Sequence, residues 1–282
     1  MKFLGTALAA GSWWLLIACS PAHEAESSLT WQTQDQRQYS LRWANLSLAV
    51  DASGGGRITS LRVADQELLT DTTVHPLYYG STLWLSPQHR WWPPPPTVDS
   101  APYRVASVAN PLTLVSRPDT ALGFQVKKYF FAQPADSSLR VTYTLINQAD
   151  TAQSVALWEV TRLPKDATVT FALDTATRLN KAFRKYPEGA AIGEHHRIRV
   201  ALSDTAVDKA WYNARGWVRY ARGERHLLKR FADLSVAQLP PQQNELEVYI
   251  DDSAYVEVEQ HSAYRRLAPQ DSLVWTVHWY PR

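Results

Sequence analysis

Two acidic segments near the C-terminus carry a polar side chain at every second position. One runs from Glu245 to Asp251 and the other from Tyr255 to His261. Alternate side chains of an extended strand share a face. The two polar rows are therefore Glu245, Glu247, Tyr249 and Asp251, and Tyr255, Glu257, Glu259 and His261. A tight connection through residues 252–254 would bring the rows together. Carboxylates held close together repel, which raises the pKa of one of them and lets it exchange protons near neutral pH.

The same alternation also fits a solvated outer face, with Leu246, Val248 and Val258 turned to the core. His261 could act as a general acid because it shares a face with Glu257 and Glu259. A lone histidine on a strand face is, however, more often a structural hydrogen-bonding group. The pattern by itself leaves both interpretations open.

A tryptophan-rich stretch at residues 84–92 is the best candidate for ligand binding. Sugars stack their C–H faces on aromatic rings, and their hydroxyls pair with amides, guanidinium groups and carboxylates. Both kinds of group occur here, as Trp84, Gln88, Arg90, Trp91 and Trp92. The prolines at 93–96 stiffen the following segment. The alternative interpretation is a stiff loop whose tryptophans only cover the core.

Strand patterns dominate the chain from about residue 41 and predict the elements that position these side chains. The runs 41–50 and 57–63 form a hairpin around Gly54-Gly55-Gly56. Further strands are expected at 104–108, 112–117, 123–131, 139–146, 153–162, 167–173, 197–202, 217–221, 226–232, 245–251, 255–261 and 273–280. Only Ala176 to Tyr186 has a weak helical pattern. Many strands without alternating helices indicate one all-β sandwich or barrel over residues 39–282.

Four segments, in this order, resemble the galactose mutarotase-like (aldose 1-epimerase) superfamily. They are Gly55-Gly56-Arg57-Ile58, Leu83 to Gln88 followed by Trp91-Trp92-Pro93-Pro94, Leu157 to Thr161, and Tyr255 to Glu259 followed by Leu267-Ala268-Pro269. More narrowly, they resemble an uncharacterised bacterial branch catalogued as a domain of unknown function. The resemblance covers roughly residue 40 to the C-terminus. It implies an antiparallel supersandwich whose concave face binds carbohydrate, without by itself implying a reaction.

The resemblance also suggests roles for individual residues. In mutarotases a glutamate on a late strand takes the proton of the anomeric hydroxyl, and a histidine protonates the ring oxygen. Glu257 best matches that glutamate, and Glu259 is the second choice. The resemblance favours a polar cavity as the position of Glu159. The chain lacks an Asn-His-x-Tyr-Phe-Asn-like element for the acid histidine, which puts catalysis in doubt.

The N-terminus indicates where the protein works. Lys2 precedes an apolar run from Phe3 to Ala18 that is too short to span a bilayer and is typical of a secretory signal. Leu16-Ile17-Ala18-Cys19 resembles the lipobox of bacterial lipoproteins. It predicts a signal peptide at 1–18, acyl chains on Cys19 and a tether at 19–38. The alternative is an ordinary signal peptide with an accidental cysteine. Ser20, where an aspartate would favour the inner membrane, predicts the outer membrane facing the periplasm in a Gram-negative cell.

Composition and spacing narrow the function classes. The formal net charge of +2 argues against a nucleic-acid partner. The single cysteine rules out a disulfide within the chain. We expect no metal and no cofactor, because His195-His196 would point to opposite faces of a strand.

Three hypotheses follow from these observations. The leading one is a carbohydrate-binding lipoprotein, the second an aldose or sugar-derivative epimerase, and the third a structural accessory protein of the envelope whose protein partner the sequence does not identify. The epimerase requires a histidine opposite Glu257 or Glu259 across a cavity. The accessory protein predicts a flat or convex surface at the tryptophan-rich stretch.

Overall fold

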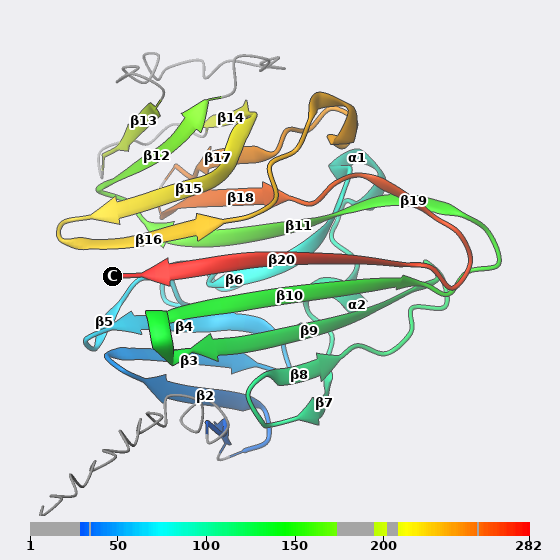
Figure 1. Ribbon diagram of the computed structural model, residues 1–282, viewed down its shortest axis with the longest axis horizontal. Helices are drawn as coiled ribbons and strands as arrows, with labels where there is room; N and C mark the ends of the chain where they lie inside the picture. The colour runs from blue at the N-terminus through cyan, green and yellow to red at the C-terminus, as the bar shows by residue number, and fades with distance from the viewer. Residues whose placement is uncertain (1–28, 34, 174–194, 202–207, 253) are drawn as a thin grey trace, which may run out of the picture.

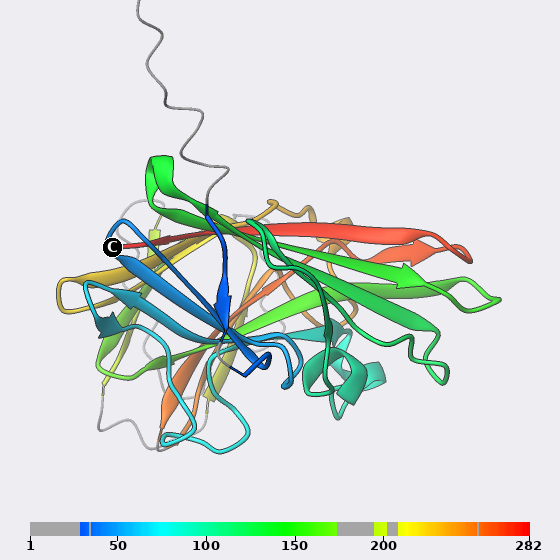
Figure 2. The same ribbon diagram turned by 90° about the horizontal axis from the view of Figure 1, so that it is seen from below.

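The computed structural model describes residues 29–33, 35–173, 195–201, 208–252 and 254–282. The expected signal peptide, Cys19 and the weak helix at 176–186 lie outside the described residues. Two antiparallel sheets make up the domain and are seen as two layers in Figures 1 and 2. The predicted all-β antiparallel sandwich is thus confirmed.

The first sheet carries the two acidic segments. Its strand order is β1 (Gln32–Thr33), β2 (Gln38–Trp43), β3 (Leu46–Asp51), β4 (Arg57–Val63), β6 (Ser81–Ser86), β11 (Gln153–Pro164), β18 (Tyr255–His261), β17 (Leu246–Ile250) and β14 (Asp208–Tyr212). Two short strands join off this path, β5 (Gln66–Glu67) on β4 and β19 (Arg265–Leu267) on β11.

The second sheet covers one face of the first. Its order is β13 (His195–Val200), β12 (Ala167–Leu173), β15 (Ala214–Arg222), β16 (Arg225–Arg230), β20 (Ser272–Pro281), β10 (Ser138–Asn147), β9 (Phe124–Gln133), β8 (Leu112–Val115) and β7 (Arg104–Ser107). Strands such as β9 and β10 alternate buried and half-buried residues, so one face of this sheet packs on the core. The short helices are α1 (Gln88–Trp91), α2 (Pro96–Asp99), η2 (Pro134–Asp136) and η3 (Val236–Gln238).

Two differences from the predicted strands have local causes. The run 41–50 is two strands, because Ala44 takes a positive φ of 48° and Trp43 pairs with Leu46 across a two-residue turn. The alternation continues through the turn and hides it. The strand β6 was not predicted, because all six of its residues are buried and give no polar alternation.

The sandwich begins earlier in the chain than residue 39. Trp31 is buried, packs edge-on against Phe130 and donates its backbone N–H to Val108 O at 2.9 Å. Strand β1 pairs with β2. Of the described residues that the sequence assigned to the tether, Trp31 therefore packs in the core, and Gln32 and Thr33 join the first sheet.

The glycine turn before β4 packs closely against the end of α2, which holds the side chain of Trp84. Gly55 has a φ of +77°, and a Cβ atom added there would lie 1.7 Å from the carbonyl oxygen of Asp99 at the end of α2. Only glycine allows this approach. The Asp99 carboxylate in turn accepts a hydrogen bond from Trp84 Nε1 at 2.8 Å, which fixes the ring of Trp84.

Candidate functional site

One face of the first sheet turns away from the second sheet, and we call it the site face. On β11 the side chains of Leu157 and Leu163 pack in the core between the sheets. Trp158 and Val160 belong instead to a separate cluster with Trp84. Because alternate residues of a strand share a face, Trp158, Val160 and Arg162 lie on the site face.

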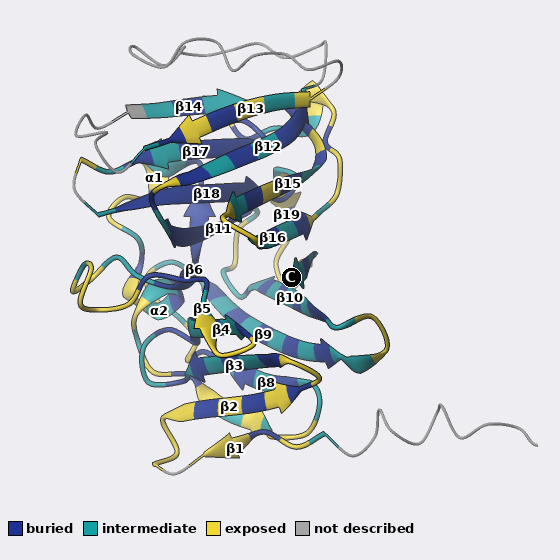
Figure 3. Cartoon of the chain, turned by 90° about the vertical axis from the view of Figure 1, so that its left-hand side faces the viewer, coloured by how far each residue is buried: buried dark blue, intermediate teal, exposed yellow. Residues whose placement is uncertain are grey.

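The strand register brings the central residues of the two acidic rows together on this face. Glu247 of β17 lies directly opposite Glu259 of β18, and Tyr249 lies opposite Glu257. All residues of β18 are buried (Figure 3). The solvated outer face considered from the sequence is therefore wrong, and Glu247, Glu257 and Glu259 are gathered on a buried face.

A cavity of 280 Å³ opens on the site face, and we call it the inner cavity. Its lining includes six aromatic rings, those of Tyr78, Trp84, Trp92, Trp158, Tyr249 and Tyr255. The other lining residues are Gln88, Lys209 and Glu257. Mostly aromatic walls with a few polar groups are typical of small-molecule sites, whose volumes begin at about 300 Å³.

Glu257 is the only carboxylate that lines the inner cavity in the described part of the chain. Its Oε1 accepts a hydrogen bond from Arg162 Nε at 2.8 Å, and both side chains are buried. Burial raises the pKa of Glu257 to about 7; the Arg162 guanidinium opposes the rise, and Glu259 adds to it. Glu257 therefore fits the role of a proton acceptor near neutral pH.

Glu247, Glu259 and Lys209 form an ionic cluster beside the cavity. Lys209 Nζ lies 2.6 Å from Glu247 Oε2 and 3.1 Å from Glu259 Oε2. Burial raises the pKa of both carboxyl groups, while Lys209 opposes the rise. Burial alone would lower the pKa of Lys209, but the two carboxylates outweigh it and raise this pKa. Lys209 thus presents a charged ammonium group to the cavity.

Glu259 and His261 lie on the predicted face but do not line the cavity. Trp158 Nε1 donates to Glu259 Oε2 at 2.8 Å, so this carboxylate orients the tryptophan. His261 is fully buried and stacks on Trp158 at a centroid distance of 5.3 Å. Burial, with a smaller contribution from Lys209, lowers the pKa of His261 to about 3. The predicted role of His261 as a general acid is therefore wrong. Its ring packs beneath Trp158 and, with so low a pKa, carries no acidic proton at neutral pH.

The tryptophan-rich stretch divides between core and cavity. Trp91 is 7% exposed and packs against Phe124 in the core. Arg90 reaches over the Trp91 ring and donates to Ser154 O at 3.3 Å, so it is not part of the cavity wall. Trp92 is 49% exposed and meets the ring of Trp84 edge-on at 5.5 Å. Of this stretch, Trp84, Gln88 and Trp92 line the inner cavity. The prediction that Arg90 and Trp91 bind ligand is wrong, because their side chains pack elsewhere.

Glu159 occupies a different place from the polar cavity expected for it. It lies between the two sheets, fully buried, with its carboxylate 2.6 Å from Lys229 Nζ and 2.6 Å from the Tyr143 hydroxyl. Its neighbours on β11, Trp158 and Val160, face the opposite way. Glu159 is an interior ion-pair residue.

Several site residues were not identified as such from the sequence, namely Tyr78, Trp158, Arg162, Lys209, Gln243 and Tyr255. Arg162 is a cation near the end of an apolar strand, and this pattern could have identified it as a candidate site residue from the sequence. Lys209 and Trp211 alternate on the five-residue strand β14, too short a pattern to recognise. Gln243 is buried and connects three elements. Its Oε1 accepts from Ser86 Oγ at 2.5 Å and Gln88 N at 2.8 Å, and its Nε2 donates to Glu247 Oε1 at 3.1 Å.

The described residues contain no group of three or more metal-ligating side chains. Among them there is also no helix long and apolar enough to cross a membrane.

The raised pKa of Glu257 predicts a pH dependence of stability. The pKa of Glu257 is 4.5 in the unfolded chain and about 7 in the folded protein. Between these two pH values the Glu257 carboxyl group is therefore protonated in the folded protein and ionised in the unfolded chain. The free energy of unfolding contributed by Glu257 therefore falls as the pH rises from 4.5 to 7, by about 3 kcal/mol in all. Urea unfolding of the wild type and Glu257→Gln across this range should show the steeper fall in the wild type. Parallel curves would contradict the assigned shift.

Comparisons with known proteins identify the family and the fold of this chain. The family model described as "Domain of unknown function (DUF4380)" matches residues 86–280. No curated protein sequence matches. A putative aldose 1-epimerase from Escherichia coli K12 has a similar structure, with a TM-score of 0.62, 12% identity, and coverage of 87% of this chain and 98% of that one.

Two further solved structures agree. A galactose mutarotase-like protein from Clostridium acetobutylicum has a TM-score of 0.61 at 9% identity and covers 92% of this chain and 99% of its own. Another from Lactobacillus casei has a TM-score of 0.60 at 11% identity, with coverage of 87% and 100%. At such identities the similarity shows the fold, and it confirms the predicted galactose mutarotase-like sandwich.

Proposed function

Because the chain belongs to the DUF4380 family of domains of unknown function and has the galactose mutarotase-like fold, we propose that it binds carbohydrate in the inner cavity. The observation that carries the proposal is the lining of this cavity, six aromatic rings around a carboxylate, an ammonium group and an amide. Aromatic rings take the C–H faces of a sugar, and the polar groups take its hydroxyls.

The aromatic wall is held in place before any ligand binds. Trp84 is fixed by Asp99, and Trp158 by Glu259. Lys209 Nζ lies 4.9 Å above the Trp158 ring, and Arg162 Cζ lies 4.9 Å from that of Trp84. A preorganised wall loses little conformational entropy on binding. Trp92 keeps an exposed ring, which is suited to stacking on a ligand.

Epimerase activity is the second candidate, favoured by the pKa of Glu257. A base with a pKa near 7 suits proton transfer from an anomeric hydroxyl. No histidine, however, is among the described residues that line the inner cavity. Lys209, held protonated by two carboxylates, is a weak proton donor at neutral pH. Binding without catalysis is therefore the better-supported function. The hollowed site face also argues against the structural accessory protein.

A polarimetric assay separates binding from epimerisation. A general acid–base pair contributes about 10²–10⁴-fold to a rate. We expect the purified protein to leave the mutarotation of glucose and galactose at the spontaneous rate. Acceleration that disappears in Glu257→Gln, with ligand binding retained, would establish the epimerase instead.

We also propose that the protein is lipid-anchored through Cys19 and faces the periplasm from the outer membrane. The lipobox-like sequence Leu16 to Cys19 supports this proposal. Each buried methylene of an acyl chain contributes about 0.8 kcal/mol to membrane binding, so several chains give durable anchoring.

The anchor predicts the behaviour of one variant. Cys19→Ser removes the thiol that carries an acyl chain, so the variant should accumulate as an uncleaved precursor or a soluble form. Detergent-phase partitioning of cell extracts measures the change, with the wild type as the reference. Equal retention of the mature wild type and a cleaved variant in the detergent phase would refute lipid anchoring.

A ligand screen tests the binding function. Ligand bound only to the folded state raises the melting temperature, and a concentration of 100 times Kd stabilises by about 2.7 kcal/mol. We expect at least one sugar in a panel of hexoses, pentoses and uronic acids to raise the melting temperature of the wild type and not that of Trp92→Ala. An equal rise in both proteins would place the binding elsewhere.

A further inference from the structure

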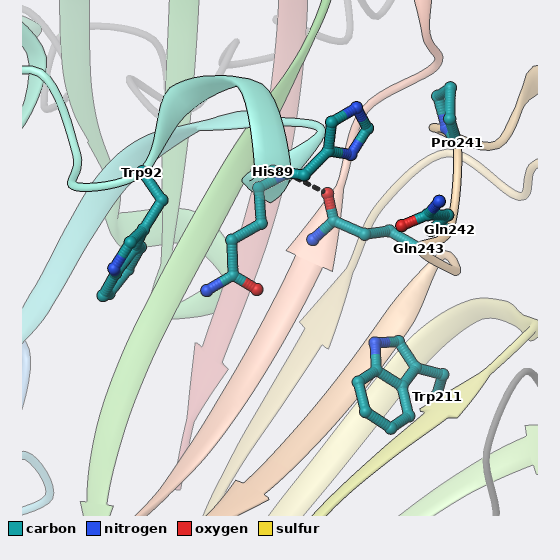
Figure 4. A pocket seen from close by; sticks show the side chains of 7 residues that line it. His89, Trp92, Trp211, Pro241, Gln242 and Gln243 are labelled. Carbon is teal, nitrogen blue, oxygen red and sulfur yellow. Dashed lines mark hydrogen bonds between the residues drawn. The ribbon is translucent and has the colours of Figure 1, made fainter.

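A second, larger cavity of 640 Å³ lies next to the inner one, and we call it the outer cavity. Gln88 and Trp92 line both cavities, so the two cavities are adjacent. The other lining residues are His89, Trp211, Pro241, Gln242 and Gln243. Figure 4 shows Trp92 on one side of this space and Trp211 on another, with Gln242 and Gln243 on the segment above Trp211.

The lining of the outer cavity differs from that of the inner one in charge. It contains two tryptophans, a proline, three glutamines and a histidine, without a carboxylate, lysine or arginine among the described residues. Flat apolar rings combined with amides offer stacking surfaces and paired donors and acceptors. This chemistry fits a neutral sugar ring.

The wall of the outer cavity is built from fixed elements. Gln243 N donates to Pro240 O at 3.1 Å, and Gln242 has a φ of 64°, so residues 240–243 form a tight turn. The Gln243 side chain ties this turn to Ser86 and to the backbone N–H of Gln88. Trp211 lies directly opposite Glu247 in the ladder between β14 and β17. Trp211 therefore lies on the strand that carries Lys209 of the inner cavity, and the turn is tied to Gln88, which lines both cavities.

We propose that the ligand is a glycan of at least two rings. One ring occupies the inner cavity beside Glu257 and Lys209, and a neutral neighbouring ring occupies the outer cavity against Trp211. Gln88 and Trp92 contact both rings at the linkage. The proposal rests on the carbohydrate-binding function and adds the length of the glycan and the charge of its second ring.

Calorimetric titration with matched sugars tests the proposal. The probes are glucose, galactose, mannose, N-acetylglucosamine and glucuronic acid, each alone and as disaccharides of two such units. We expect at least one neutral-ended disaccharide to bind at least tenfold more tightly than its monosaccharide. Trp211→Ala should remove this gain and leave the affinity for the monosaccharide unchanged.

Two further variants guard against an effect of misfolding. Gln242→Gly removes an exposed amide of the outer cavity at a position whose backbone glycine tolerates. It should weaken the disaccharide and not the monosaccharide. Val274→Ala, an exposed position on the second sheet, should change neither.

The outcomes separate this inference from the function on which it rests. Disaccharides that bind no more tightly than monosaccharides would refute the binding of a second sugar ring in the outer cavity and leave the carbohydrate-binding function intact. An equal loss of both affinities in Trp211→Ala would do the same. Absence of binding for every probe would overturn the carbohydrate-binding function and the inference together.

Discussion

Replacing Lys229 by methionine is expected to lower the free energy of unfolding by about 3–5 kcal/mol. The Lys229 side chain is 1% exposed and its Nζ lies 2.6 Å from Glu159 Oε1, between the two sheets. It also donates to Thr161 Oγ1 and to Gln260 Oε1. Methionine fills the space but leaves the Glu159 carboxylate buried without its cation, which is costly in a low-dielectric interior. Urea denaturation at neutral pH measures the loss.

The matched control removes both charges. Lys229→Met combined with Glu159→Gln leaves no unpaired charge, so the double variant should recover a large part of the lost stability. The single variant Glu159→Gln should bind sugar as the wild type does, because this carboxylate faces away from the inner cavity. A Lys229→Met protein within about 1 kcal/mol of the wild type would contradict the interior ion pair.

The neighbours Trp91 and Trp92 should respond to alanine in opposite ways. Trp91→Ala removes a buried ring from the core and should cost about 3–5 kcal/mol of stability. Trp92 is 49% exposed, so Trp92→Ala should leave the free energy of unfolding within about 1 kcal/mol. Its loss should weaken sugar binding by at least about 30-fold, the effect of losing an aromatic hot spot worth 2 kcal/mol.

Chemical denaturation and ligand titration of the two variants measure both effects. Only ligand affinity should fall in Trp92→Ala, whereas Trp91→Ala should lose stability. A large destabilisation in both variants would mean that each ring mainly covers the core. Unchanged affinity in Trp92→Ala would remove this ring from the site.

The sequence predicts the acidic face well and its environment poorly. Period-two alternation correctly placed Glu247, Glu257 and Glu259 on one face, because it depends only on extended backbone geometry. The same alternation arises whether the face meets water or a cavity. What decides burial here is Lys209 on β14 and the aromatic residues around it, brought together by strand pairing rather than by local sequence.

Side-chain direction in the tryptophan-rich stretch is a tertiary property. Trp91 ends the short helix α1, and Trp92 follows it with extended backbone. Which of two adjacent rings enters the core depends on Phe124, a partner far away in the chain. Glu159 is a similar case. The sequence shows a charge on an apolar strand, but its partner Lys229 lies on the other sheet and cannot be assigned by pattern.

The most direct test of the proposed carbohydrate site is a glycan array probed with the wild type and with Trp92→Ala at equal concentration. The proposed function predicts that the wild type retains a defined set of glycans with at least two rings, and that Trp92→Ala loses them while keeping the melting temperature of the wild type. Retention of no glycan by the wild type would contradict carbohydrate binding. Retention of the same glycans at the same intensity by the variant would contradict a binding site at Trp92.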